Sequence, residues 1–405
     1  MSERTESQSE SLPRIEVGWV FAGRLNHEDV CALKLARERL LGFFKETFSR
    51  FEWKMPVVYR REVIQQHRVS PVVLIETGAS ERELGCWDFA FVVTEADLIG
   101  HQKPYVLGTP SQALSVGVLS TSRIDPEALG EELSTEARVE VMSRRAQALA
   151  LHLFGHMNHV GHSSSPDCWM YDLDRVEALD KMTRFSSGAL TGLRETLERV
   201  GDVRLEERET YQSRRGLRFV FNVLWSERRE VFHGVQKMRP WRFPFQLSRL
   251  TMAALSAQLL LINTAEAWDL GMSQPVFQIV WMSIAALFGM TLFVIKRQRL
   301  LVSRDPRGVS EQRVIAVASI VLSMGVGMLT TYLMLFSGTL ILAWGLFSEA
   351  LVTRWASSLQ GPPGVASYLV FAGFVATLGL IIGAMGASFE EEAYIRHVAF
   401  VDEET

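Results

Sequence analysis

The fold is decided by the stretch Ala148-Leu149-Ala150-Leu151-His152-Leu153-Phe154-Gly155-His156-Met157-Asn158-His159-Val160-Gly161-His162. His152 and His156 are four residues apart, so on a helix both imidazoles project from one face. His162 follows six residues later, far enough for the chain to leave the helix and turn back toward the same point. Three imidazoles on one zinc ion leave one tetrahedral position open for water or substrate. We therefore predict a metal site with His152, His156 and His162 as ligands and Zn²⁺ as the ion.

This spacing resembles the zinc-binding run of the metzincin metallopeptidases, H-E-x-x-H-x-x-G-x-x-H. The later run Cys168-Trp169-Met170-Tyr171-Asp172 is similar to the tight, Met-containing turn that lies beneath the metal in that family. The expected order of strands and helices over about residues 15–200 resembles the archaemetzincin-like branch. The resemblance implies an α+β zincin-like (metzincin) N-terminal domain at 14–200 and a zinc-dependent metallopeptidase that acts on peptide or protein. The cysteines that hold a second zinc in many archaemetzincin-like proteins are absent, so we expect a single metal ion.

One departure from the family pattern bears on catalysis. Leu153 stands where the family has the Glu that acts as general base. Zinc alone lowers the pKa of its bound water to about 7, whereas a general base contributes about 10²–10⁴-fold. Two functions therefore stay open: a metallopeptidase, with His159, Tyr171 or an acid such as Glu95 or Asp97 in place of the missing base, and a catalytically inactive pseudoenzyme that binds peptide or metal as a sensor or regulator.

A second departure places His159 where the family has Gly. We expect Asn158 or Gly161 to take the left-handed conformation that the turn requires. His159 has three candidate roles, since it could point into the cleft, serve as a proton carrier or replace His162 as a ligand. Tyr171 resembles the tyrosine that stabilises the oxyanion in some metzincins, and the alternative is an aromatic side chain packed after a turn.

The rest of the N-terminal domain is predicted from hydrophobic periodicity and helix caps. Helices are expected at Asn26–Phe51, from Ser134 to the histidines, at Asp174–Met182 and at Leu190–Val200, and strands at Arg14–Phe21, Pro56–Tyr59, Pro71–Ile75 and Trp87–Leu98. Ser111–Arg123 alternates apolar and small polar residues, which favours an exposed edge strand. In metzincins such a strand borders the cleft and pairs with extended peptide; an ordinary half-buried strand is the alternative.

The composition separates two kinds of sequence. Hydrophobic residues make up 48% of the 405 residues, and from about residue 250 they form long uncharged runs. A net charge of −4 gives no basis for nucleic-acid binding. The three cysteines match no disulfide framework, which favours a reducing compartment. Residues 1–13 are polar, lack the apolar core of a signal peptide, and are expected to be a disordered tail.

The apolar runs predict an α-helical transmembrane domain at 246–389. Spans are expected at about 250–268, 273–295, 314–347 and 366–389, because about 20 apolar residues cross a bilayer. The third is too long for one upright helix, so it tilts, projects beyond the lipid, or folds near Ser337-Gly338 into a hairpin. Four or five spans are therefore open. Ionisable residues are lacking deep within these runs, which argues against an ion-coupled carrier.

Basic residues predict the orientation. They gather before the first span and between the second and third, whereas the loop between the first and second has only Glu266 and Asp269. The positive-inside rule then makes this an integral, multi-pass membrane protein with its N-terminal domain in the cytoplasm. The connector at 201–245 is either a solvated helix or an amphipathic helix on the lipid surface, and residues 390–405 form an acidic tail. Small residues in the spans suit close helix packing or homo-oligomerisation: Gly325, Gly327, Gly373, Gly379 and Gly383.

Overall fold

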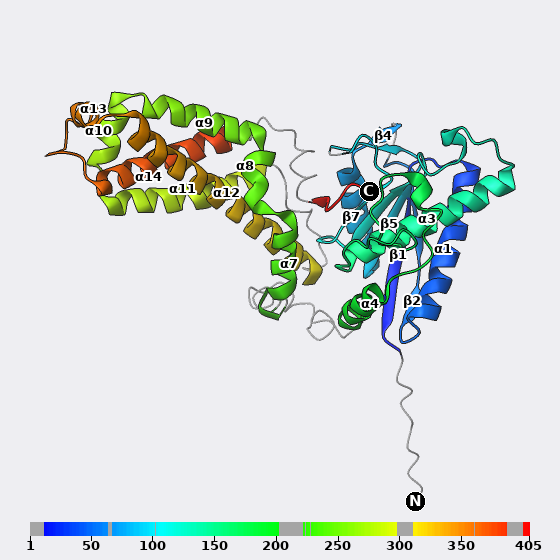
Figure 1. The fold of residues 1–405 in the computed structure, drawn as a ribbon. Helices are drawn as coiled ribbons and strands as arrows, with labels where there is room; N and C mark the ends of the chain where they lie inside the picture. Colours follow the sequence, from blue (N-terminus) through cyan, green and yellow to red (C-terminus); the bar gives the residue numbers. More distant parts are fainter. Residues whose placement is uncertain are drawn as a thin grey trace, which may run out of the picture. The chain divides into compact units, whose positions relative to one another are not determined.

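The computed structural model describes residues 12–63, 67–101, 103–201, 222, 224–226, 228–297, 311–359, 361–386 and 400–405. They belong to two compact units (Figure 1). Unit 1 contains Met1–Val223, Asp305–Arg313 and Phe400–Thr405, and unit 2 contains Leu224–Arg304 and Val314–Ala399. Each unit is described by itself.

A largely parallel sheet forms the centre of unit 1. Its strands lie in the order β2 (Glu52–Lys54), β1 (Arg14–Ala22), β5 (Phe89–Thr94), β8 (Val116–Ser120) and β7 (Gly108–Ser111), and β3 (Val57–Arg60) also pairs with β1. β7 pairs antiparallel with β8, and the other pairings in this sheet are parallel. All six residues of β5 are buried, as its continuous apolar run predicts. Unit 1 is therefore an α/β fold rather than the expected α+β fold.

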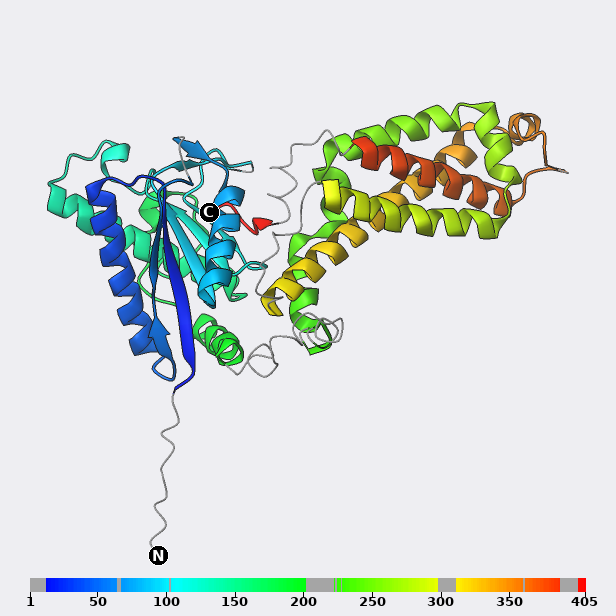
Figure 2. The ribbon, with the colours of Figure 1, turned by 180° about the vertical axis from the view of Figure 1, so that it is seen from behind.

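Helices cover both faces of this sheet (Figures 1 and 2). Adjacent residues of β8 point to opposite faces: Val116 lies against Gly78 of α2 (Pro71–Gly85), and Gly117 lies against Leu153 of α3 (Thr135–Met157). α1 (His27–Thr47) and α4 (Ser187–Val200) share one hydrophobic core with α3. The expected cap of α3 is confirmed, because the Ser134 hydroxyl accepts a hydrogen bond from the backbone N–H of Ala137.

Three predicted elements of unit 1 are wrong. Pro71–Ile75 is the first part of α2 and not a strand, because a proline in the first helical turn after Ser70 is a helix start. Asp174–Met182 contains only a short 3₁₀ turn at Val176–Ala178. Within Ser111–Arg123, residues 116–120 form β8, which lies buried between β5 and β7 and is not an exposed edge. The edge strand is β7.

Unit 2 is helical. Its main helices are α7 (Arg228–Met238), α8 (Phe243–Gln246), α9 (Ser248–Ile262), α10 (Ala265–Ser273), α11 (Val276–Arg297), α12 (Glu311–Leu346), α13 (Glu349–Trp355) and α14 (Val365–Gly386). Among the described residues, three helical segments are long and apolar enough to span a membrane, namely Val276–Arg297, Val317–Leu346 and Val365–Gly386. A fourth is reached only if Gly234–Gln246 and Arg249–Ile262, which meet at 49°, count as one span.

Two span predictions change. The expected first span at 250–268 is interrupted, because α9 ends at Ile262 and α10 starts at Ala265. α12 continues without a break through Ser337 and Gly338, so the hairpin and the five-span alternative are wrong. Its 36 residues correspond to about 54 Å of helix, longer than the hydrocarbon core of about 30 Å.

Glycines allow close packing in unit 2, as predicted. A Cβ on Gly383 of α14 would lie 2.9 Å from the Cβ of Ala254 in α9. Gly327, Gly373 and Gly379 also face close neighbours, namely Phe243, Ile279 and Leu335. Gly325 differs, since a Cβ there would meet no described atom within 4 Å. The buried amide of Gln258 donates hydrogen bonds to the Leu335 carbonyl and the Thr339 hydroxyl across the helix interface.

Several predictions fall outside the described residues. They concern the start of the N-terminal tail (1–11), most of the charged connector (202–221), the basic loop (298–310) and the first part of the acidic tail (387–399). Cys31, Cys86 and Cys168 are all free thiols.

Candidate metal centre

The last turns of α3 bring two histidines together. Their four-residue spacing puts His152 and His156 on one helix face, with ring centroids 4.6 Å apart. That face points into the protein, because His152 is fully buried and His156 is 5% exposed. α3 ends at Met157, and Asn158 closes it by donating from its side-chain amide to the Phe154 carbonyl.

The turn after α3 depends on His159. Its φ of 64° places it in the left-handed region, at the position where the metzincin pattern has Gly. The expectation that Asn158 or Gly161 would take this conformation is wrong: Asn158 has φ −103°, and Gly161 is not among the described residues with positive φ. The side chain of His159 contacts the amide of Gln112 through Nδ1, and His159 is not part of the group formed by the other three imidazoles. It therefore does not replace His162.

Three imidazole nitrogens converge at one point. The Nε2 atom of His156 lies 3.1 Å from Nε2 of His152 and 3.1 Å from Nε2 of His162. These three residues form a group whose ligand atoms all lie within 4.8 Å of one another. Two nitrogen ligands at about 2.0–2.1 Å from a tetrahedral zinc are about 3.3–3.4 Å apart. The histidines therefore have the separation that one such ion requires.

Hydrogen bonding within the group also fits a cation. Nδ1 of His152 lies 2.7 Å from the Trp169 carbonyl and donates to it, which leaves a lone pair on Nε2. Burial lowers the pKa of His152 to about 4, so the ring is neutral at physiological pH. Nε2 of a neutral His156 carries at most one proton and can satisfy only one of its two neighbours. A cation between the three nitrogens would attract the lone pairs of all three. Neutral imidazoles held in place by a carbonyl are typical zinc ligands.

The Met-containing turn lies under these histidines. The backbone N–H of Tyr171 donates to the Cys168 carbonyl, which closes the turn, and the Met170 carbonyl accepts from the N–H of Ser163. Met170 is 1% exposed, and its sulfur would lie 2.2 Å from a Cβ at Gly155. Gly155 is therefore small because Met170 packs against α3 at that point. Tyr171 is half-buried at the edge of the core, and its oxyanion role stays a prediction.

The position of the missing general base is filled by a packed apolar side chain. Leu153 is fully buried, and its Cδ1 and Cβ atoms approach Gly108 of β7 and Gly117 of β8. The two acids considered as substitutes are engaged elsewhere. Glu95 accepts from the backbone N–H of Asn26, and Asp97 forms ion pairs with Arg123 and Arg68.

A carboxylate that sequence reasoning missed lies at the histidines. Oε1 of Glu403 is 3.3 Å from Nε2 of His162, and Oε2 is 3.7 Å from Nε2 of His156. A second group of candidate ligand atoms joins His162, Asp172 and Glu403. Asp172 belongs to the predicted Met-containing turn, but Glu403 is more than 200 residues from the histidines along the chain. The acidic character of residues 390–405 was the only sequence signal for a carboxylate at this site.

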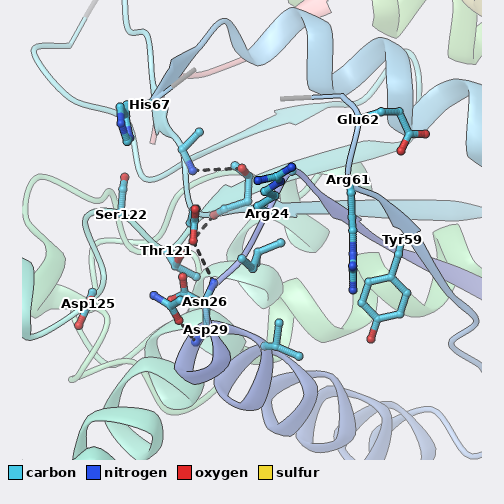
Figure 3. Close-up of a pocket in the computed structure, with 16 residues that line it drawn as sticks. Arg24, Asn26, Asp29, Tyr59, Arg61, Glu62, His67, Thr121, Ser122 and Asp125 are labelled. Carbon is cyan, nitrogen blue, oxygen red and sulfur yellow. Dashed lines mark hydrogen bonds between the residues drawn. The ribbon is translucent and has the colours of Figure 1, made fainter. Parts of the chain in front are cut away.

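A separate cavity of about 1190 Å³ opens at the carboxyl ends of β1, β5 and β8 (Figure 3). Asn26, Asp29 and Thr121 lie together in it, and the three histidines are not among its lining residues. Burial raises the pKa of Asp29 to about 7. Open α/β sheets bind ligands at this edge, and no sequence motif predicts this cavity.

Comparisons with known proteins find likeness over part of the chain. No protein-family model matches it, and no curated protein matches it significantly. Archaemetzincin from Methanopyrus kandleri is 18% identical, with a TM-score of 0.37 over 46% of this chain and 97% of that one. A zinc-dependent peptidase from Methanocorpusculum labreanum (18%, TM-score 0.34) and archaemetzincin from Archaeoglobus fulgidus complexed with malonate (17%, TM-score 0.33) each cover 44% of this chain and 99% of their own.

Proposed function

We propose that unit 1 is a zinc-dependent metallopeptidase domain of the metzincin type and that unit 2 anchors it in a membrane. The observation that carries this proposal is the convergence of three Nε2 atoms, with His156 3.1 Å from both His152 and His162. Zinc held there would supply a Lewis acid and a bound water with a pKa of about 7.

The chain's own residues prepare this site. The Trp169 carbonyl fixes the His152 ring so that its Nε2 faces the other two histidines. Met170 packs beneath them against Gly155. His159 is the nearest titratable side chain outside the ligand set in sequence, and we propose it as a proton carrier at the rim of the site. Tyr171, next to Met170, is proposed to stabilise the oxyanion.

A catalytically inactive zinc domain is the second candidate. It is favoured by Leu153, which fills the position of the general base and is fully buried against the sheet. Such a domain would bind peptide or metal as a sensor at the membrane. Both candidates need the same metal ion and differ only in turnover.

A chelator-controlled peptidase assay separates the two candidates. The full chain in detergent is incubated with a library of quenched fluorescent peptides, with and without 1,10-phenanthroline. An active peptidase cleaves some of them, stops with chelator, and is inactive as His156→Ala; His67→Ala, which changes a histidine outside the cluster, is the control. Zinc-loaded protein that cleaves none of them, both as wild type and as Glu403→Ala, which removes the carboxylate next to the histidines, would favour the inactive domain.

We propose further that unit 1 faces the cytoplasm. The support is the positive-inside rule applied to the basic segments before α9 and after α11, while the loop before α11 has only Glu266 and Asp269. Cys86 is an exposed free thiol on unit 1 and serves as a natural reporter. A membrane-impermeant maleimide should label it in inside-out vesicles and leave it unlabelled in sealed right-side-out vesicles, with Cys86→Ser as control. Labelling with the opposite sidedness would reverse the orientation.

A further inference from the structure

Phe400–Thr405 lies along the free edge of β7 in unit 1 (Figure 1). The backbone N–H of Thr405 donates to the Gly108 carbonyl, and the Gly108 N–H donates back to the Thr405 carbonyl. Asp402 donates from its N–H to the Pro110 carbonyl. Residue numbers rise along Phe400–Thr405 as they fall along β7, so the two segments pair in antiparallel directions.

Side chains on both sides of Glu403 fix this segment in place. The Glu404 carboxylate accepts the backbone N–H groups of His101 and Lys103 at 2.6 and 2.7 Å, and Glu404 is 2% exposed. The Asp402 carboxylate accepts the backbone N–H of Gln112 at 2.5 Å. Phe400 is 1% exposed. Charge-assisted bonds of this kind, buried beside an apolar anchor, indicate specific docking.

The register of this pairing brings Glu403 to the histidines. Its two oxygens lie 3.3 Å and 3.7 Å from the Nε2 atoms of His162 and His156. Ligand atoms on one tetrahedral zinc are separated by about 3.3 Å. Oε1 is therefore at ligand spacing from His162, although Glu403 lies outside the group that joins all three histidines. The three histidines leave one tetrahedral position for a further ligand.

We infer that Phe400–Thr405 occupies the edge of β7 as an intramolecular ligand and that Glu403 would supply the fourth ligand to a metal held by the three histidines. This inference rests on the proposed zinc site. With the segment docked, a metal held by the histidines and Glu403 would have no free position for water or a substrate carbonyl.

Co²⁺ in place of zinc tests this inference without relying on turnover. The full chain in detergent is loaded with Co²⁺ and titrated with acetohydroxamate, which needs a free coordination position, while the visible Co²⁺ absorption is recorded. If Glu403 occupies the coordination position more than about 90% of the time, acetohydroxamate must displace it and binds about tenfold more weakly. Wild type should therefore need at least about tenfold more acetohydroxamate than Glu403→Gln or Glu403→Ala.

A matched control and an anchor variant sharpen the test. Glu195→Gln changes an exposed acid of α4 and should titrate like wild type. Glu404→Gln keeps Glu403 but weakens the docking, and it should also bind acetohydroxamate more tightly than wild type. Normal Co²⁺ uptake with identical spectra and titrations in wild type, Glu403→Ala and Glu404→Gln would overturn the inference alone. Failure of wild type to take up Co²⁺ would overturn the zinc function as well.

Discussion

Nδ1 of His152 lies 2.7 Å from the backbone carbonyl oxygen of Trp169, the residue that precedes Met170 in the turn beneath the histidines. This one bond links the end of α3 to that turn. It also selects the tautomer in which Nε2 of His152 faces His156 and His162.

The buried His152 predicts a pH dependence of stability in metal-free protein. Its pKa is about 4 when folded, because burial disfavours the charged ring, against 6.5 when unfolded. Between these values the unfolded chain binds more protons, so stability rises with pH up to about 6.5 and falls by about 3 kcal/mol as pH drops to 4. Chemical unfolding with chelator across this range should show the slope in wild type and a smaller slope in His152→Gln. Equal slopes in the two proteins would show that the pH dependence does not come from His152. His27→Gln is the control and should keep the wild-type slope.

Leu153→Glu should destabilise unit 1. Leu153 is fully buried against Gly108 and Gly117, so a glutamate there would place a carboxylate among apolar atoms. We expect a loss of at least about 3 kcal/mol, measured by thermal unfolding of the zinc-loaded protein. Leu153→Met keeps the volume and should cost less than about 1.5 kcal/mol. A Leu153→Glu protein as stable as Leu153→Met would show that the site has room for the missing base.

Gly155 and Met170 should be energetically coupled. A Cβ at Gly155 meets the Met170 sulfur at 2.2 Å, so Gly155→Ala forces Met170 to move and should cost about 1–3 kcal/mol. In a double-mutant cycle, Gly155→Ala should cost much less in a Met170→Ala background. Strictly additive effects on the free energy of unfolding would mean that the two residues do not share this contact.

In unit 2, two glycine variants should have different effects on the stability of the helix packing. Gly383→Ala places a methyl group 2.9 Å from Ala254 and should weaken the packing of α14 on α9, whereas a methyl group at Gly325 would meet no described atom within 4 Å. Gly325→Ala should be neutral or stabilising by up to about 1 kcal/mol, because alanine is the better helix former. Resistance to SDS-induced unfolding is the measurement. A Gly383→Ala protein at least as stable as Gly325→Ala would contradict the described packing.

Local periodicity explains what the sequence predicted well. The spacing of His152 and His156, the cap at Ser134 and the apolar run of β5 each depend on neighbours within a few residues. Short apolar runs are ambiguous between helix and strand, which is why Pro71–Ile75 was assigned to a strand although it starts α2.

The contacts missed from the sequence are nonlocal. Gln112 and Asp402 are 290 residues apart, and no periodicity links them. The proposed role of Glu403 depends on this pairing, so the carboxylate at the histidines could not be predicted from the sequence. His159 was missed as the left-handed residue for another reason: glycine and asparagine adopt that conformation more readily, and the fold overrides this preference.

Zinc content measured by plasma mass spectrometry tests the central claim most directly. The full chain, purified in detergent without added metal and desalted, should contain about one zinc per chain. His156→Ala should lose it because Nε2 of His156 stands between the other two ligands, and His67→Ala should keep it. A correctly folded wild type without zinc that takes none up when Zn²⁺ is supplied, or a His156→Ala protein with undiminished zinc, would contradict the metal centre.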